Sequence, residues 1–504
     1  MSSISTTSSA ASTAAANAAM QSAAQSIISG STGNTSMDVG TLVTALVNAK
    51  TAGQAAALTA QQTSDNTQVS AYGALSAALD ALQSGIAGLA TGATLSTFTA
   101  TASGTGLSAT AGTGAVAGSY SVGVTQIASS QALSSAAFGA TTQLGTGTLT
   151  ISLDGQSMNV NVDSTNNTLS GIAASINSGN GNPGVTATVV TGTDGAHLVL
   201  RSANTGAANV INVSANVTSD NGLSSLGVTS TASTTGGESS ITSANSSNAW
   251  TQSSYAEDAE FTVGGIAASS STNSVTSAIS GVTLNLAAAS AGTTQTLNIT
   301  ADTSAQSTAI NNFVSLYNTV VTTMGTLTSY NSSSSSQGPL LGDSTLMTIQ
   351  NTLATIVGGA VGSGSTGSTL AAIGITLKDD PADGTMVINN TTLSTALTSS
   401  PATVAALFNP TNGIAEQLNS SITNFTQTGG IIDTRTSALS TDLASITTQQ
   451  SALSDYTAQL TSQYQAQFTA LDTLMATMNN NSQYLTALFG GANSAGALAS
   501  ANNT

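Results

Sequence analysis

The chain of 504 residues has no cysteine, one histidine and four basic residues against 21 acidic ones, which gives a formal charge of −17. Without cysteine, neither a disulfide framework nor a thiolate metal site can form. Nucleic-acid binding needs clustered Lys and Arg to neutralise phosphates, and four scattered cations exclude it. The sequence also contains no run of about 18 apolar residues, so it predicts no transmembrane helix.

Charged and aromatic residues are scarce, at 5% and 3% of the chain. Full disorder is nevertheless excluded, because 40% of the residues are hydrophobic and they follow regular patterns. Residues 1–36 are rich in Ser, Ala and Thr and lack the basic start and apolar core of a Sec signal. We therefore expect a chain that is either intracellular or exported by a route that removes no signal, and the composition favours an extracellular location.

Both ends of the chain show the three- and four-residue spacing of amphipathic helices. Val39, Leu42 and Leu46 begin one stripe, and a second runs from Val69 to Leu89. A third, near the C-terminus, alternates steps of four and three as in a coiled coil. Its members are Leu439, Leu443, Ile446, Gln450, Leu453, Thr457, Leu460, Tyr464, Gln467, Leu471, Leu474 and Met478. Such stripes need apolar partners, so we expect the two ends to pair as a stalk.

Between these ends the pattern changes to the alternation typical of strands. Period-two segments run from about Thr94 to Thr300, with a short helix predicted at Leu169–Ile176. Residues 229–249 are rich in Ser, Thr and Asn and are predicted to be loop. Further helices and a hairpin are predicted at 305–327, 346–357, 375–388, 393–397 and 404–408.

This order predicts an α+β multidomain fold, with a helical coiled-coil or bundle stalk made from both chain termini and antiparallel β head domains inserted between them. A stalk of this kind depends on both ends of the chain. The predicted divisions are 1–36, a flexible N-terminal segment; 37–58 with 453–489, a terminal coiled-coil leg; 59–95 with 303–452, a helical stalk domain with a small hairpin; 96–130 with 245–302, an inner β head domain; 131–244, an outer β head domain; and 490–504, a flexible C-terminal tail.

Residues that could carry chemistry are few and dispersed. His197 is the only histidine and has no cluster of acidic partners at strand spacing, so we interpret it as an ordinary strand residue. The glycines 179, 181 and 184 match a dinucleotide-binding pattern, but helix precedes them and strand follows, which predicts a turn.

Two acidic groups are candidate cation sites. Residues 379–384 are similar to a calcium loop, but proline occupies the third ligand position, so a solvated hairpin turn is predicted. Glu257, Asp258 and Glu260 are predicted to form a solvated face. The hydroxyl groups have no paired base. We therefore expect no enzyme activity and no catalytic, cofactor-binding or metal-binding residues.

Several stretches, taken in order, resemble the flagellar filament cap family, also called flagellar hook-associated protein 2. They are residues 37–46, 70–75, 81–83, 118–128 (GSYSVGVTQIA), 258–286, 342–346, 373–376, 401–408, 429–433, 467–472, 478–479 and 482–485. The segments 169–177 and 184–202 resemble a repeat found in flagellins and hook-associated proteins. Together these stretches cover roughly residues 37–489 in family order.

The resemblance implies export through the flagellar type III apparatus, assisted by an export chaperone. It implies a homo-oligomer, a ring of about five subunits at the distal filament tip, with flagellin and the hook–filament junction proteins among its partners. Helical legs would reach into the filament, and the β head domains would form a plate. The cap would retain exported flagellin and promote its polymerisation, with adhesion to host mucus glycans as a secondary role. Neither nucleic acid nor membrane is an implied partner.

Leg assembly is assigned to apolar residues on both terminal stripes. The predicted interface residues are Val39, Leu42, Leu46, Leu453, Leu460, Tyr464, Phe468, Leu471, Leu474, Met478 and Leu485. The family carries Arg, Lys and Glu in its helices where residues 50–68 and 439–466 carry mostly Ser, Thr and Gln, so we expect weakly salt-sensitive contacts.

Two other classes of function were considered. An extracellular adhesin or phage-tail-like fibre would place β repeats before one terminal anchor. A carbohydrate-active enzyme would need paired carboxylates in a β cleft, and the acids of this chain are dispersed. The pairing expected for the two chain ends favours the cap.

Overall fold

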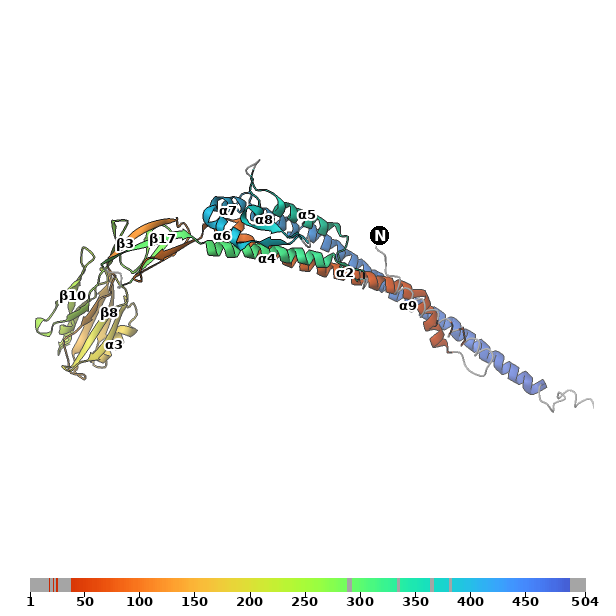
Figure 1. Ribbon diagram of the computed structural model, residues 1–504. Helices are drawn as coiled ribbons and strands as arrows, with labels where there is room; N and C mark the ends of the chain where they lie inside the picture. Colours follow the sequence, from red (N-terminus) through yellow and green to blue (C-terminus); the bar gives the residue numbers. More distant parts are fainter. Residues whose placement is uncertain are drawn as a thin grey trace, which may run out of the picture. The chain divides into compact units, whose positions relative to one another are not determined.

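The structure is a computed structural model that describes residues 38–287, 292–332, 336–362, 367–379 and 383–489, together with residues 18, 21, 24 and 25. The described chain divides into two compact units (Figure 1). A helical unit contains the residues up to Ala90, then Asn311–Ala396, and those from Ala402 onward. A β unit contains Thr91–Ile310 and Leu397–Pro401. The predicted tail 490–504 lies outside the described residues, as does the segment 1–36 apart from the four single positions.

Two long helices dominate the helical unit, α2 (Val39–Ala90) and α9 (Ile431–Phe489), and they lie side by side. The α2 stripe from Tyr72 to Leu89 is fully buried, as its spacing predicts. It packs against α8 (Ile414–Thr426), and Leu316 of α4 (Thr303–Leu327) lies beside Gly85, while α5 (Ser344–Gly358) packs against α8 and α9. The bundle is therefore a closed apolar core, whereas the remainder of α2 and α9 forms a helix pair.

Smaller elements complete the helical unit. Phe313 of α4 and Phe408 meet edge to face, with ring centroids 6.0 Å apart. The sequence indicated α4, α5 and the hairpin, but α8 escaped it, although Ile414, Leu418 and Ile422 of α8 are fully buried. The other elements are β18 (Tyr330–Asn331), β19 (Ser336–Gln337), η6 (Leu370–Ile373), β20 (Ile375–Leu377), β21 (Met386–Ile388), α6 (Asn390–Ser399) and α7 (Pro401–Leu407).

The β unit begins with η1 (Thr94–Ser96) and contains two apolar cores. The inner core lies between a five-stranded sheet, in the order β1-β17-β3-β13-β14, and a three-stranded sheet, β15-β16-β2. All pairings are antiparallel. The strands are β1 (Phe98–Ala102), β2 (Leu107–Ala111), β3 (Gly118–Gln126), β13 (Ala259–Val263), β14 (Ile266–Ser270), β15 (Ser274–Ile279), β16 (Val282–Leu286) and β17 (Thr293–Ala301).

The outer core lies between the sheets β11-β10-β9-β5-β6 and β12-β4-β8-β7, with α3 (Leu169–Ser178) packed against it. Thr168 caps α3 by accepting a hydrogen bond from the Gly171 N–H. The strands are β4 (Ala132–Ser134), β5 (Gly145–Leu153), β6 (Gln156–Val162), β7 (Val185–Thr191), β8 (Ala196–Ser202), β9 (Asn212–Asp220), β10 (Val228–Thr231), β11 (Ser240–Ser243) and β12 (Thr251–Ser254); the helical turns η2 (Leu223–Leu226) and η3 (Ser246–Asn248) lie between them.

The prediction of a loop at residues 229–249 was wrong, because β10, β11 and η3 occupy much of this segment. Ser230 is buried there, and its hydroxyl donates to the Ile211 carbonyl and accepts from Gln131 Nε2. A hydroxyl with both partners can lie inside a core, so the alternation of this strand is hidden by its polar composition. The overall class is nevertheless the predicted one, α+β with long terminal helices and inserted antiparallel sheets.

Candidate assembly interface

The first part of α2 and the middle of α9 form an antiparallel two-helix contact, here called the leg pair (residues 39–58 and 446–468). Asp38 starts it by capping α2: its carboxylate accepts from the Thr41 N–H at 3.0 Å and from the Thr41 hydroxyl at 2.7 Å. These hydrogen bonds, first among them the hydroxyl bond, lower the pKa of Asp38. The capped end fixes where α2 begins along α9.

Three apolar clusters hold the leg pair together. Leu42 and Ala45 pack with Leu46 and Phe468 in one cluster. Val43, Val47 and Leu460 form a second with Tyr464 and Phe468, while Val39 contributes to both. Leu58, Ile446 and Leu453 form a third. The structure thus brings together seven residues assigned to the leg, namely Val39, Leu42, Leu46, Leu453, Leu460, Tyr464 and Phe468.

The last part of α9 extends beyond the start of α2. Val39 is the first residue of α2 and packs against Phe468, so no residue of α2 lies opposite the segment that follows. Four apolar side chains of this segment are exposed to solvent. They are Leu471 (40% exposed), Leu474 (56%), Met478 (64%) and Leu485 (53%). We call these four residues the distal stripe.

Within the leg pair, the predicted seam differs from the structure at one position, whereas its last three members, Leu471, Leu474 and Met478, lie beyond the contact. Gln467 is exposed, and the neighbouring Phe468 contacts α2 instead. The larger apolar ring gains more from leaving water than an amide does, so it decides which face of the helix turns inward.

Hydroxyl groups on the surface of α9 are bonded within the helix itself. Thr457 and Thr461 donate to the carbonyls four residues before them at 2.7 and 2.8 Å. Thr473 and Thr477 do the same at 2.9 and 2.8 Å beside the distal stripe. A partner can therefore cover this surface without leaving these donors unsatisfied.

A polar cluster joins three helices above the leg pair. The Tyr72 hydroxyl donates to Asp343 Oδ1 at 2.6 Å, and the same oxygen accepts from the N–H groups of Thr345 and Leu346 at the start of α5. Arg435 Nε lies 3.6 Å from Asp343 Oδ2, and its Nη2 donates to Gln68. Burial, followed by the bond to Asp343, raises the pKa of Tyr72 to about 12. We call Tyr72, Asp343, Arg435 and Gln68 the Asp343 clasp.

Comparison with known families decides the relationship of the chain. Residues 35–131 match the flagellar hook-associated protein 2 N-terminus, residues 256–480 match its C-terminus, and residues 148–204 match the flagellin hook IN motif. Flagellar hook-associated protein 2 of Escherichia coli K12 is 35% identical over 440 residues, which cover 84% of this chain and 90% of that protein. The chain belongs to the flagellar hook-associated protein 2 family.

Other relatives agree with this assignment. The B-type flagellar hook-associated protein 2 of Pseudomonas aeruginosa is 31% identical over 431 residues, which cover 83% of this chain and 89% of that protein. The crystal structure of the D1-D2-D3 domains of the flagellar cap protein FliD from Escherichia coli superposes with a TM-score of 0.59 at 33% identity, covering 73% of this chain and 99% of that one. The family is therefore one of structural proteins and not of enzymes.

The histidine and the glycine-rich segment that the sequence singled out as candidate functional sites have structural roles. His197 Nδ1 lies 2.7 Å from the Ser135 carbonyl oxygen, and Nε2 lies 3.1 Å from Asp194 Oδ1, so the turn residue Asp194 is its partner. The glycines 181 and 184 have φ values of 78° and 101° in the turn between α3 and β7. These positions give turn and strand geometry rather than a ligand site.

The acidic groups also bind protein donors. Asp258 accepts a hydrogen bond from the Ala207 N–H at 2.7 Å, and Glu257 accepts one from the Ser129 hydroxyl at 3.1 Å. The prediction of a solvated face was therefore wrong for these two residues. Asp383 lies 3.7 Å from Lys378 Nζ, whereas residues 380–382 of the predicted turn fall outside the described residues. Within the described ranges, no three potential ligand side chains are grouped so that they could hold a metal ion.

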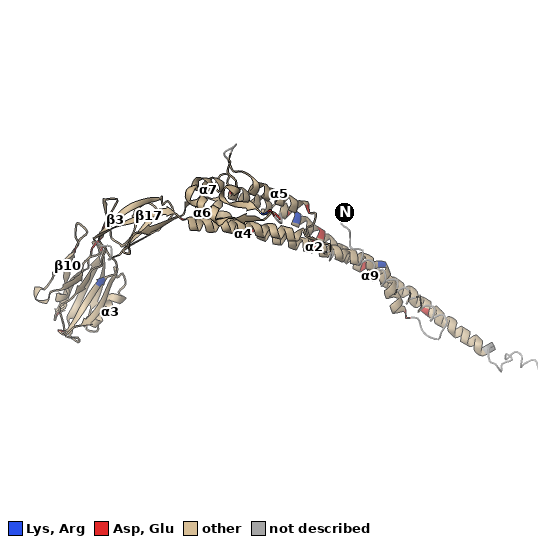
Figure 2. Cartoon of the chain, in the orientation of Figure 1, with Lys and Arg blue, Asp and Glu red and all other residues tan. Residues whose placement is uncertain are grey.

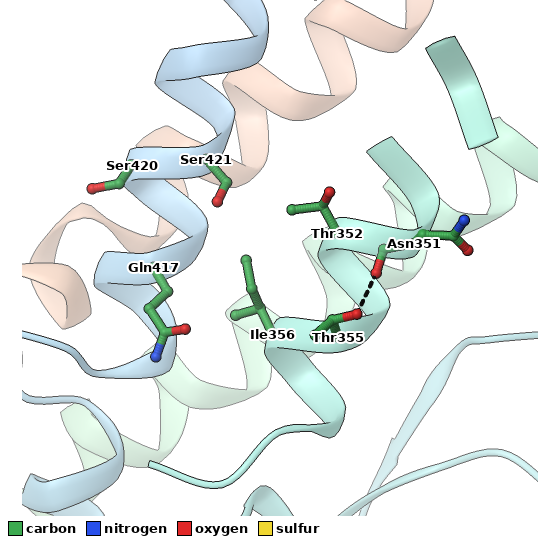
Figure 3. A pocket seen from close by; sticks show the side chains of 7 residues that line it. All are labelled: Asn351, Thr352, Thr355, Ile356, Gln417, Ser420 and Ser421. Carbon is green, nitrogen blue, oxygen red and sulfur yellow. Dashed lines mark hydrogen bonds between the residues drawn. The ribbon is translucent and has the colours of Figure 1, made fainter. Parts of the chain in front are cut away.

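Charged residues are sparse along both units (Figure 2). A groove of about 520 Å³ between α5 and α8 shows the same composition (Figure 3). Thr352 and Ile356 line it from α5, and Gln417, Ser420 and Ser421 from α8. Because the lining has no titratable group, the groove offers no acid–base chemistry. None of the helices in the described part of the chain has the length and apolar character needed to cross a membrane.

Proposed function

We propose that this chain caps the distal tip of the bacterial flagellar filament as a homo-oligomeric ring of about five subunits. The ring retains flagellin that emerges from the type III export apparatus and promotes its polymerisation. The chain reaches this place by the same apparatus, held by an export chaperone beforehand, and first meets the hook–filament junction proteins. Membership of the family and the match to a flagellar cap protein support this proposal.

The observation that carries the mechanism is the distal stripe. Leu474 and Met478 are more than half exposed on a helix whose earlier leucines, Leu453 and Leu460, are buried. An exposed apolar stripe on a helix marks a docking surface, and we assign to it the contact with flagellin or with neighbouring subunits at the filament end. The predicted division into leg, stalk and head domains remains a proposal of the same kind.

Reversible docking suits the composition of this surface. The cap must move as each flagellin subunit is added, so its leg contacts have to break repeatedly. Apolar side chains and internally bonded hydroxyls give contacts of modest strength that depend little on salt, because ion pairs contribute little to them. The adhesin or fibre alternative expected one terminal anchor, whereas here both terminal helices pair.

The test replaces three of the four residues of the distal stripe with serine. The triple variant Leu471→Ser, Leu474→Ser and Met478→Ser is produced in a strain that lacks its own cap gene. We expect unpolymerised flagellin in the medium and few filaments, because the docking surface is gone. The control variant Thr469→Ser, Ala476→Ser and Asn480→Ser alters exposed residues on the opposite face of α9 and should restore filaments. Normal filaments from the stripe variant would overturn the mechanism.

A further inference from the structure

The inner face of α2 changes its character between the leg pair and the bundle. Leu58 and Tyr72, at the two borders, are buried and apolar or aromatic. Between them the face presents Gln62, Asp65 and Gln68, spaced three residues apart and therefore on one side of the helix. The face of α2 that is apolar at both ends is thus interrupted by a polar layer, although α9 contributes the buried Leu439 and Ile446 to the same stretch.

The partners across the seam satisfy the two amides but not the acid. Gln62 Oε1 accepts from Gln450 Nε2 at 3.1 Å, and Gln68 Oε1 accepts from Arg435 Nη2 at 3.2 Å. Asp65 lies between them with only 8% of its surface exposed, and within the described chain its Oδ2 finds no hydrogen-bond donor. A buried oxygen without a donor loses its hydration and gains nothing in return.

The charges around Asp65 do not compensate for this loss. On α9, Asp442 repels it and Arg435 attracts it, but Arg435 already binds Gln68 and lies beside Asp343. Asp343, at the start of α5, is bound by the Tyr72 hydroxyl. Burial first, and Asp442 second, raise the pKa of Asp65 above its ordinary value of 3.8, against the opposing effect of Arg435.

We propose that the polar layer around Asp65 is an acid-tightened joint, at which the leg pair opens while the bundle stays closed, and that loss of the Asp65 charge closes the joint. The Asp343 clasp lies on the bundle side of Asp65 and keeps α9 attached to α2 and α5 when the leg pair opens. The role of the joint in the filament rests on the proposed function of the legs, whereas its existence rests on the burial of Asp65, its missing hydrogen-bond donor and the charges around it.

The sign of the pH effect follows from the raised pKa. Between the unfolded and the folded pKa of Asp65, the paired helices bind more protons than the separated ones, so acid favours pairing. The leg pair should therefore become more protected as the pH falls from neutrality through the folded pKa of Asp65 towards its ordinary value of 3.8, and the bundle should not follow it.

Hydrogen exchange of the full chain tests the joint, with rates corrected for the intrinsic effect of pH. In the wild type, we expect the protection of residues 39–58 and 446–468, relative to residues 72–90, to increase at the lower pH. Asp65→Asn should remove most of this pH dependence. Asp65→Leu should raise protection of the leg pair about tenfold at neutral pH, since an apolar residue replaces an unsatisfied charge.

The matched control is Asp80→Leu, an identical change at an exposed position of the same helix. It should leave protection of the leg pair unchanged and keep its pH dependence. A wild-type leg pair whose relative protection does not depend on pH would overturn the proposal, and so would an Asp65→Asn variant that keeps the full dependence. Because exchange is measured on purified protein without filaments, the joint and the proposed function can fail independently.

Discussion

The outer core of the β unit, with the two sheets around it, and the leg pair use similar apolar side chains but bury them to different degrees. In the outer core two sheets and α3 enclose Ile151, Ile172 and Leu198, each at most 1% exposed. In the leg pair two helices cover only one stripe of each other, and the stripe continues past the contact as Leu474 and Met478. The difference shows where folding alone completes the burial of apolar surface and where a partner is needed to complete it.

The largest expected effect on stability comes from a substitution inside the outer core of the β unit. Ile151→Ala leaves a cavity between the sheets and should destabilise this part of the β unit by about 2–5 kcal/mol. Trp250, the only tryptophan, is buried in the same core, so its fluorescence reports on this part of the β unit. Its unfolding midpoint should fall, while the helical circular dichroism signal keeps its own midpoint.

The control for that comparison is Val190→Ala in the same part of the β unit. Val190 is 50% exposed, so its truncation should change stability by no more than about 0.5 kcal/mol. A shift of the helical transition together with the Trp250 transition would show that the two regions unfold as one and would break the comparison.

The next largest expected effect is a loss of stability in the helical unit. Asp343→Ala removes the cap of α5, the acceptor of the Tyr72 hydroxyl and the anion beside Arg435. A lost cap and a buried donor without its acceptor together should cost about 2 kcal/mol. The helical signal should melt earlier and the Trp250 signal should not, whereas Asp455→Ala, at an exposed position of α9, should do neither. An Asp343→Ala variant as stable as the wild type would show that the clasp does not hold the helices.

The contrast between the two regions also explains what the sequence could reveal. Periodic leucines, such as Leu453 and Leu460, predict a helix and its buried face, so the terminal helices and the α+β class were predictable. Phe468, as a leg residue, and Gln467, as a seam residue, were both predicted to face α2, and which of the two does so depends on where α2 begins along α9. The segment around Ser230 failed for another reason: Gln131, about a hundred positions earlier in the chain, supplies one of its partners.

The polar layer around Asp65 also could not be predicted from the local sequence. Asp65 in a row of polar residues looks like any solvated position of a helix, since its burial exists only once α9 is in register with Asp442 nearby. Similarly, the exposure of Leu474 depends on the helix pair ending at Val39. Local pattern therefore gives the elements and their faces, while register between distant segments decides which faces become sites.

The smallest expected effect concerns the single histidine of the sheets around the outer core. When protonated, His197 can donate to both the Ser135 carbonyl oxygen and Asp194, and these bonds, the carbonyl first, raise its pKa above 6.5. Since the folded pKa is the higher one, the stabilisation is complete below the unfolded pKa and is lost as the pH rises through the folded pKa. The Trp250 midpoint should drop by about 2 °C between mildly acidic and mildly alkaline pH, and His197→Gln should flatten this step because glutamine does not titrate. A step of the same size in the variant would assign the pH dependence to other groups.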